Sequence, residues 1–181
     1  GHTTTYEYDA MDRVVKVIDA EGEDATSEYD KVGNLVKQVD RLGRTTTYEY
    51  DGMNRLVRRI DPPADSNTPA ASTRFAYDAN GNLVRVTDAL DRVTQYVYDR
   101  RDRRIEIIDA AGRSQTLSYD EEDNVTATRD ALGRLTSHRY DVLNRLVEST
   151  LPDPDGIGGQ DAPVLRFGYD LASNRTRSTD A

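Results

Sequence analysis

The sequence predicts an all-β fold of tandem antiparallel β-hairpins, in which about sixteen short strands form a curved single-layer sheet. Three observations predict it. A Tyr-Asp pair recurs with a 21-residue period, a second Asp follows most of these pairs ten residues later, and stretches of strand-like composition separate the aspartates. The eight pairs are Tyr8-Asp9, Tyr29-Asp30, Tyr50-Asp51, Tyr77-Asp78, Tyr98-Asp99, Tyr119-Asp120, Tyr140-Asp141 and Tyr169-Asp170.

The stretches between the aspartates are predicted strands because Thr, Tyr, Val and Ile predominate in them. In residues 45–50, Tyr48 and Tyr50 share one face and Glu49 lies on the other, since side chains alternate along a strand. This alternation recurs, so an aromatic stripe is expected along one face. Tyr50 is expected opposite Leu56 across the following turn, as an aromatic–aliphatic pair. The equivalent pairs are Tyr29 with Leu35 and Tyr77 with Leu83.

Each aspartate is predicted to begin a tight turn. Its carboxylate can accept backbone N–H groups two residues on, and a residue in the left-handed conformation at the fourth position closes a type I turn with a bulge. Gly, Asn and Asp tolerate the positive φ that this position requires. They occupy it at Asp12, Gly22, Gly33, Gly43, Asn54, Gly81, Asp91, Asp102, Gly112, Asp123, Gly133 and Asn144.

The second turn of each unit is expected to differ from the first. Its aspartates are Asp19, Asp40, Asp61, Asp88, Asp109, Asp130 and Asp180. Because the period is odd and side chains alternate by two, two identical hairpins would send successive tyrosines to opposite faces. We therefore predict a longer loop or bulge at the second turn, for example after Asp40. Insertions at residues 62–72 and 151–163 also fall at this turn and are expected at one edge of the sheet.

The composition excludes several classes of protein. The net charge of −9 argues against a nucleic-acid partner, because phosphate binding requires clustered Lys and Arg. Cysteine is absent, so neither disulfides nor thiolate metal sites are available. No apolar run is long enough to cross a membrane, and no signal peptide is expected within these residues.

No catalytic residue, metal ligand or cofactor is predicted. The fixed spacing of the aspartates is explained by the turns, whereas a catalytic pair needs two carboxylates held close in a desolvated site. His138 takes a place filled by Tyr or Phe in other repeats, so we interpret it as a member of the aromatic stripe. A calcium site is the alternative for the oxygen-rich loop of Asp153, Asp155, Asp161 and residues 156–159, although this loop lacks the closing Glu of an EF-hand.

The aromatic stripe raises the question of ligand binding. Tyr48 and Tyr96 are the candidate contacts for a sugar, while aliphatic partners such as Leu56 favour packing instead. We also expect Lys37 and Arg58 to lie along aromatic rings of the preceding strand.

With its unit written as Thr46-Thr47-Tyr48-Glu49-Tyr50-Asp51-Gly52-Met53-Asn54-Arg55-Leu56-Val57 and closed by Asp61, the chain resembles the YD repeats of Rhs proteins. The resemblance covers essentially the whole chain, and a tandem array of eight makes it specific. Arg104 and Arg175 depart from the pattern, which has an aliphatic residue at these positions. In bacterial Rhs toxins, the C components of insecticidal toxin complexes and the teneurins, such repeats spiral as a β-sheet into a hollow shell.

The resemblance implies that residues 1–181 are a single array of eight repeats from a longer protein. The array would form part of the wall of a shell around a toxin or other C-terminal domain, with no catalysis of its own. Neither that domain nor the self-cleaving core of the family is expected on this chain. The resemblance also implies a secreted or cell-surface protein. The alternative function is an extracellular module that binds carbohydrate or a surface protein through the repeated tyrosines.

The partners implied are neighbouring YD repeats and the enclosed C-terminal domain of the parent protein. Glycans or surface proteins belong to the alternative. Open edge strands at the two ends also favour self-association, because an unpaired strand edge is a template for another strand.

Overall fold

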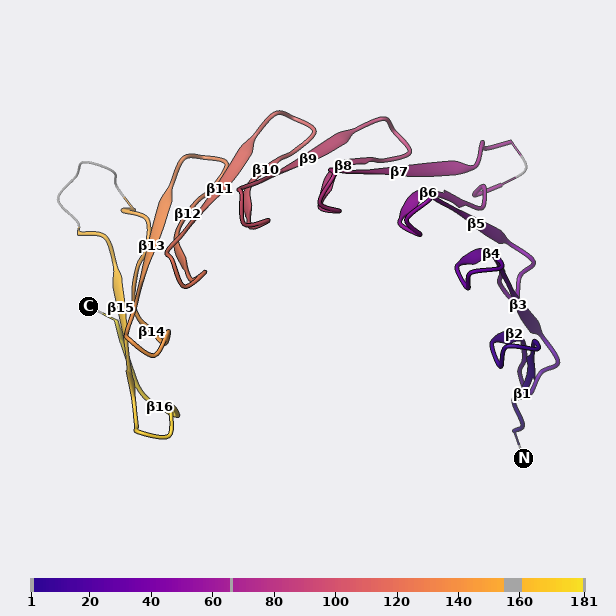
Figure 1. Cartoon of the computed structure of the whole chain (residues 1–181), viewed down its shortest axis with the longest axis horizontal. Helices are drawn as coiled ribbons and strands as arrows, with labels where there is room; N and C mark the ends of the chain where they lie inside the picture. Colours follow the sequence, from indigo (N-terminus) through magenta and orange to yellow (C-terminus); the bar gives the residue numbers. More distant parts are fainter. Residues whose placement is uncertain (1, 66, 155–160, 181) are drawn as a thin grey trace. The chain divides into compact units, whose positions relative to one another are not determined.

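The computed structural model has the all-β fold that the sequence predicts (Figure 1). The structure describes residues 2–65, 67–154 and 161–180, and every regular element in these ranges is a β-strand. Within the same ranges, no helix has the length and apolar character needed to cross a membrane. The chain divides into two compact units, residues 1–93 and 94–181.

The first unit contains eight antiparallel strands, each paired with the next one in the chain. They are β1 (Thr5–Tyr8), β2 (Val14–Ile18), β3 (Asp24–Tyr29), β4 (Leu35–Val39), β5 (Thr45–Tyr50), β6 (Leu56–Asp61), β7 (Ala71–Tyr77) and β8 (Leu83–Thr87). The direction of the strands changes gradually from hairpin to hairpin within this unit, so this part of the sheet is not flat (Figure 1).

The second unit has the same topology. Its strands are β9 (Val93–Tyr98, which begins at the unit boundary), β10 (Arg104–Ile108), β11 (Ser114–Tyr119), β12 (Val125–Arg129), β13 (Leu135–Tyr140), β14 (Leu146–Thr150), β15 (Val164–Tyr169) and β16 (Arg175–Asp180). Both insertions lie at second turns, one between β6 and β7 and the other between β14 and β15.

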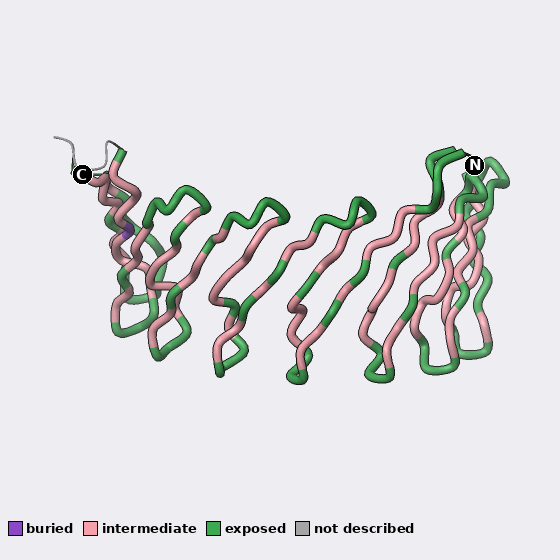
Figure 2. Tube along the Cα trace, turned by 90° about the horizontal axis from the view of Figure 1, so that it is seen from above, coloured by how far each residue is buried: buried purple, intermediate pink, exposed green. Residues whose placement is uncertain are grey.

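The sheet has one layer in each unit and no enclosed core. Among the described residues only Ser149 is buried, and no hydrophobic side chain is. Figure 2 shows the consequence: strands are mostly of intermediate exposure, and the turns at both ends of the hairpins are exposed. Stability must therefore come from contacts between neighbouring strands rather than from a common interior.

The strand register separates two faces. Tyr48 pairs with Arg59, and Tyr50 pairs with Leu56. We call this side, which also carries Tyr6, Tyr8, Tyr29, Phe75 and Tyr77 in the first unit, the tyrosine face. The expected pairs Tyr50–Leu56, Tyr29–Leu35 and Tyr77–Leu83 are all confirmed. The opposite face carries ion pairs such as Glu28 with Lys37, together with apolar residues such as Val39 and Ile60.

The prediction of a bulge or longer loop at the second turn, after Asp40, Asp88, Asp109 and Asp130, is wrong. The register shift lies in the hairpin of the first turn in every repeat. Within the two units, the hairpins of the second turn keep their register. In β6 the extra residue is Val57, because Leu56 pairs with Tyr50 while Arg58 pairs with the adjacent Glu49. One bulge per repeat corrects the odd period and keeps all tyrosines on one face.

Candidate functional site

The repeated residues of one turn form a closed set of hydrogen bonds. In the turn that follows β5, Asp51 Oδ1 accepts the backbone N–H groups of Met53 and Arg55 at 2.9 and 3.0 Å. Asp51 Oδ2 accepts Arg55 Nε at 2.8 Å and pairs with Arg55 Nη2 at 2.7 Å. The backbone N–H of Asn54 donates to the Asp51 carbonyl at 3.0 Å. The carboxylate thus holds both the backbone and the last side chain of the turn.

The fourth turn position has the left-handed conformation. Asn54 has φ 59° and Gly43 has φ 73°. All twelve residues that the sequence places at this position have positive φ, and Ser173 (φ 65°) takes it in the last repeat. Sequence reasoning missed Ser173 because serine is not among the residues that usually adopt this conformation.

These hydrogen bonds change the acidity of the turn carboxyls. The bond from the Arg55 side chain, and then the bond from its backbone N–H, lowers the pKa of Asp51 below the ordinary Asp value. The pKa values of Asp9 and Asp40 are lowered in the same way by Arg13 and Arg44. Each carboxylate is therefore stabilised in its charged form, the opposite of what a catalytic acid needs.

The tyrosine of a Tyr-Asp pair reaches back to the preceding repeat, as six of these tyrosines show. The Tyr50 hydroxyl donates to the backbone carbonyl of Leu35 at 3.0 Å. Leu35 is the residue just before the bulge of its own hairpin. The same bond, at 2.8–3.2 Å, joins Tyr29 to Val14, Tyr77 to Leu56, Tyr119 to Arg104, Tyr140 to Val125 and Tyr169 to Leu146. A bulge interrupts the regular ladder, and the phenol supplies a donor at that point.

An arginine at the end of alternate first turns reaches forward to the next repeat. The Arg55 guanidinium lies over the Tyr77 ring, 4.7 Å from its centroid, and its Nη1 donates to the Asp78 carbonyl at 3.2 Å. We call this arrangement the arginine clamp. It recurs with Arg13 on Tyr29, Arg103 on Tyr119 and Arg145 on Tyr169. These four arginines are 21–24% exposed.

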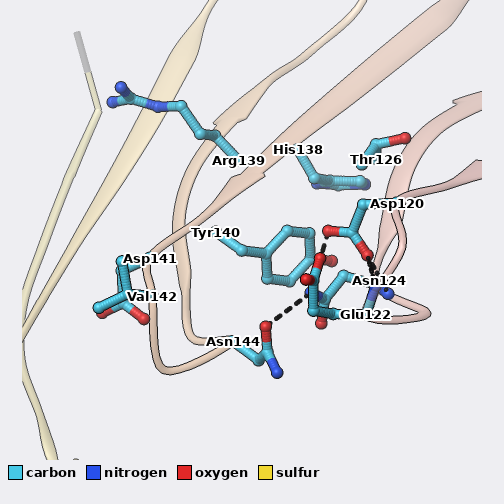
Figure 3. Close-up of a pocket in the computed structure, with 10 residues that line it drawn as sticks. All are labelled: Asp120, Glu122, Asn124, Thr126, His138, Arg139, Tyr140, Asp141, Val142 and Asn144. Atoms are coloured by element: carbon cyan, nitrogen blue, oxygen red, sulfur yellow. Dashed lines mark hydrogen bonds between the residues drawn. The ribbon is translucent and has the colours of Figure 1, made fainter.

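The other first turns end in asparagine, at Asn34, Asn82, Asn124 and Asn174. Asn34 Nδ2 donates to its own Asp30 and to Asn54 of the next first turn, at 2.9 and 3.0 Å. Figure 3 shows the equivalent bond from Asn124 to Asn144 beside the Tyr140 ring, in an open groove of ≈ 550 Å³. Arg and Asn alternate, so the structural period in this position is two repeats.

The arginines of the second turns make only the local part of the clamp. Arg44 pairs with Asp40 through Nε and Nη2, each at 2.7 Å, but its side chain is 59% exposed. Arg92, Arg113 and Arg134 repeat this geometry at 60–66% exposure. The arginine clamp, which crosses from one repeat to the next, therefore occurs at the first turns.

The expectation that Lys37 and Arg58 lie along aromatic rings is wrong. They lie on the opposite face and pair with Glu28 and Glu49. The cations on the rings are those of the arginine clamp, a role that sequence reasoning missed. Arg104 and Arg175, which interrupt the aliphatic pattern, also lie over rings, those of Tyr96 and Phe167.

The candidate ligand residues Tyr48 and Tyr96 belong to β5 in the first unit and β9 in the second. Tyr48 pairs with Arg59 on β6, and Tyr96 lies under Arg104 in the second unit. His138 lies on the tyrosine face, where its Nδ1 is 2.9 Å from Ser149 Oγ. The described part of the chain holds no group of three His, Asp or Glu suited to a metal ion.

Most of the loop in the calcium hypothesis lies outside the described residues. Asp155 and residues 156–159 lie outside the described residues, and only Asp153 and Asp161 of that set fall within them.

A comparison with protein-family models identifies a repeat family over most of the chain. The family model described as RHS Repeat matches residues 1–24, 29–63, 77–114 and 119–155, more than half of the chain. A comparison with curated protein sequences gives no match.

Several solved structures have the same fold over nearly the whole chain. The crystal structures titled TcdB2-TccC3-Cdc42 and TcdB2-TccC3 match 98% of this chain with TM-scores of 0.79 and 0.78, each at 17% identity. A third, TcdB2-TccC3 without its hypervariable C-terminal region, has a TM-score of 0.64 at 15% identity. This chain spans 11% of the length of each of these chains.

Proposed function

Because this chain belongs to the RHS repeat family, we propose that it is part of the wall of a hollow β-shell, one that encloses a toxin or another C-terminal domain of its parent protein. The likeness in fold to TcdB2-TccC3 over 98% of the chain supports this proposal. The chain spans about a tenth of the matched structures. The single array of eight repeats, the longer parent, the enclosed domain and a location outside the cell are therefore parts of the proposal.

One observation carries the proposal: the polar groups of the repeated residues bind the neighbouring repeat. The Tyr50 hydroxyl binds a carbonyl of the repeat before, Asp51 holds its own turn, and Arg55 covers the tyrosine of the repeat after. Residues used in this way extend a sheet and leave no set of free groups aimed at a substrate. We therefore assign the repeats a structural role without catalysis.

The alternative, a carbohydrate- or protein-binding module, gains less support. A sugar platform needs aromatic rings open to solvent, whereas the arginine clamp covers Tyr29 and Tyr77 in the first unit. Tyr48 and Tyr96 remain the residues on which to test it.

The proposal is tested on the natural protein that contains residues 1–181. Limited proteolysis should leave the C-terminal domain intact in the native protein and degrade it once the repeats are unfolded, and electron microscopy should place the repeats around it. A C-terminal domain digested at the same rate in both states would overturn enclosure. Glycan binding by residues 1–181 that is lost in Tyr48→Ala with Tyr96→Ala, at unchanged unfolding midpoint, would support the binding module instead.

A further inference from the structure

On the face opposite the tyrosines, the first unit carries cross-strand ion pairs at equivalent places in successive repeats. Glu28 on β3 lies directly opposite Lys37 on β4, and their charged groups are 2.7 Å apart. Glu49 on β5 lies opposite Arg58 on β6 in the same way, at 3.4 Å. In both pairs the acid immediately precedes the tyrosine of a Tyr-Asp pair. One strand of each hairpin thus supplies a carboxylate for the cation of the other.

The hairpin of β7 and β8 interrupts this series. Ala76 takes the place of the acid, and it lies directly opposite Arg85. In the described part of the chain, no side chain forms an ion pair or hydrogen bond with the guanidinium of Arg85. Both residues are exposed. This cation is therefore accessible, and its own hairpin gives it no carboxylate.

Two further arginines lie beside Arg85 on the same face. Arg74 is two residues before Ala76 on β7, so it lies diagonal to Arg85, about 7–8 Å away. Arg58 on β6 lies directly opposite Arg74. Asp61, the one acid within strands β6, β7 and β8, lies on the tyrosine face. Like charges directly opposite each other destabilise a sheet, so a bound anion would offset a cost that the free chain carries.

The partners that these arginines have within the chain leave donors available. Arg74 approaches Asp91 at 3.5 Å and is 58% exposed. Arg58 donates to Ser72 Oγ at 2.9 Å, and its ion pair with Glu49 is longer than the 2.7 Å pairs of the turns. A guanidinium has five N–H donors in a planar fork that matches a carboxylate. The three arginines can therefore bind further carboxylates.

Arg74, Ala76 and Arg85 line an open groove of ≈ 410 Å³, together with Val57, Phe75 and Thr87. We propose that this groove binds an acidic segment of a partner protein, with an Asp or Glu side chain of that segment beside Arg85, where the other hairpins have their own glutamate. A carboxylate is the favoured anion because the equivalent cations of the two preceding hairpins pair with carboxylates. The binding does not depend on whether the repeats enclose a domain.

The second unit contains a similar groove that is partly neutralised. Arg166, Gly168 and Arg177 repeat the pattern of the first groove and line a space of ≈ 500 Å³. Here Glu148 lies directly opposite Arg166, in the place that Arg58 has in the first unit, and pairs with it at 3.0 Å. Asp180 also lines this groove. The groove between β6 and β8 is therefore the one that an acidic segment would select.

Calorimetric titration of residues 1–181 with a hexaglutamate peptide at low salt tests the proposal. We expect one site, which weakens as salt is added, and no binding of hexaglutamine. Ala76→Glu supplies the carboxylate from within the hairpin and should lower the affinity at least about tenfold. Ala76→Gln, which has the same size and no charge, should change it by less than about twofold. Circular dichroism shows whether both variants remain folded.

Two further variants separate this groove from the general charge of the face. Arg58→Glu copies the arrangement at Glu148 and should also abolish peptide binding. Lys37→Gln removes an exposed cation that already has Glu28 as its partner, so it should leave binding unchanged. Absence of hexaglutamate binding, equal affinities of the Ala76→Glu and Ala76→Gln variants, or equal effects of Arg58→Glu and Lys37→Gln would overturn the proposal. Inorganic phosphate that binds as tightly as the peptide would overturn the assignment of a protein partner.

Discussion

At the scale of the residue, the hydroxyl explains why the position before each first-turn Asp is always tyrosine. All eight of these positions hold Tyr, while the position two residues earlier holds Tyr, Ser, Phe, Leu or His. Both positions face the same side of the sheet, so burial of a ring does not distinguish them. The hydroxyl does, because it bonds to the carbonyl before the preceding bulge, as Tyr50 does to Leu35. Phe would cover the same strands and leave that carbonyl without the donor.

The arginine clamp predicts a difference between two turns with the same local chemistry. Arg55→Ala should destabilise residues 1–181 by about 1–2 kcal/mol, because it removes a cation–π contact and a hydrogen bond to the next repeat. Arg44→Ala removes the same type of ion pair to a turn Asp, at an exposed site, and should cost less than about 0.5 kcal/mol. Urea unfolding followed by circular dichroism measures both. Equal losses would mean that the contact with Tyr77 contributes nothing.

The sequence separation that each interaction spans decides whether the sequence predicts it. Asp51 forms its side-chain hydrogen bonds within the next four residues, so its turn could be predicted from a single repeat. Arg55 acts on Tyr77 in the following repeat, and it alternates with asparagine. Neither fact is visible when the repeats are compared one period at a time. The alternation of Arg13, Asn34, Arg55 and Asn82 at this position was the signal available in the sequence.

At the scale of the element, the parity argument required one bulge per repeat but could not place it. Both turns have an Asp first, a residue of positive φ fourth and the same backbone bonds, as the turns at Asp40 and Asp51 show. The bulge lies after the first turn, where the residue before it accepts the tyrosine hydroxyl of the next repeat. That contact joins two hairpins, so local sequence does not contain it.

Two glycines with different backbone conformations provide the element-scale prediction. Gly43 has φ 73° at the left-handed turn position, and no atom lies within 4 Å of an added Cβ. Gly43→Ala should therefore cost about 1–2 kcal/mol through backbone strain alone. Gly52 also has space for a Cβ but no positive φ, so Gly52→Ala should be neutral or stabilise by up to about 1 kcal/mol. Thermal unfolding of the two variants compares them, and a neutral Gly43→Ala would contradict the turn assignment.

At the scale of the whole molecule, the fold depends on many identical carboxylates rather than on a core. No hydrophobic side chain among the described residues is buried, and each repeat is held by its turn aspartates and by its neighbours. In a repeat protein of this kind stability is approximately a sum over repeats and their contacts. A change that acts on every turn at once should therefore affect the chain far more than any single substitution.

Acid is such a change. The pKa values of Asp9, Asp40 and Asp51 are lowered by hydrogen bonds from their arginines, so their contribution is complete above the ordinary Asp pKa of about 3.9 and is lost as the pH falls through the lowered values. Burial raises the pKa of Tyr50 and Tyr140, so their contribution is complete below the ordinary Tyr pKa of about 10 and is lost as the pH rises through the raised values.

We therefore expect a plateau of stability between about pH 5 and about pH 9, a steep cooperative loss below about pH 4 and a shallower loss above about pH 10. Urea midpoints measured across this range test the prediction. The measurement should be repeated in 1 M salt, where screening weakens exposed ion pairs but leaves the backbone N–H bonds to the carboxylates. An acid loss that persists in salt identifies the turn hydrogen bonds as its cause, and stability that holds below pH 3 would show that the turn aspartates do not sustain the sheet.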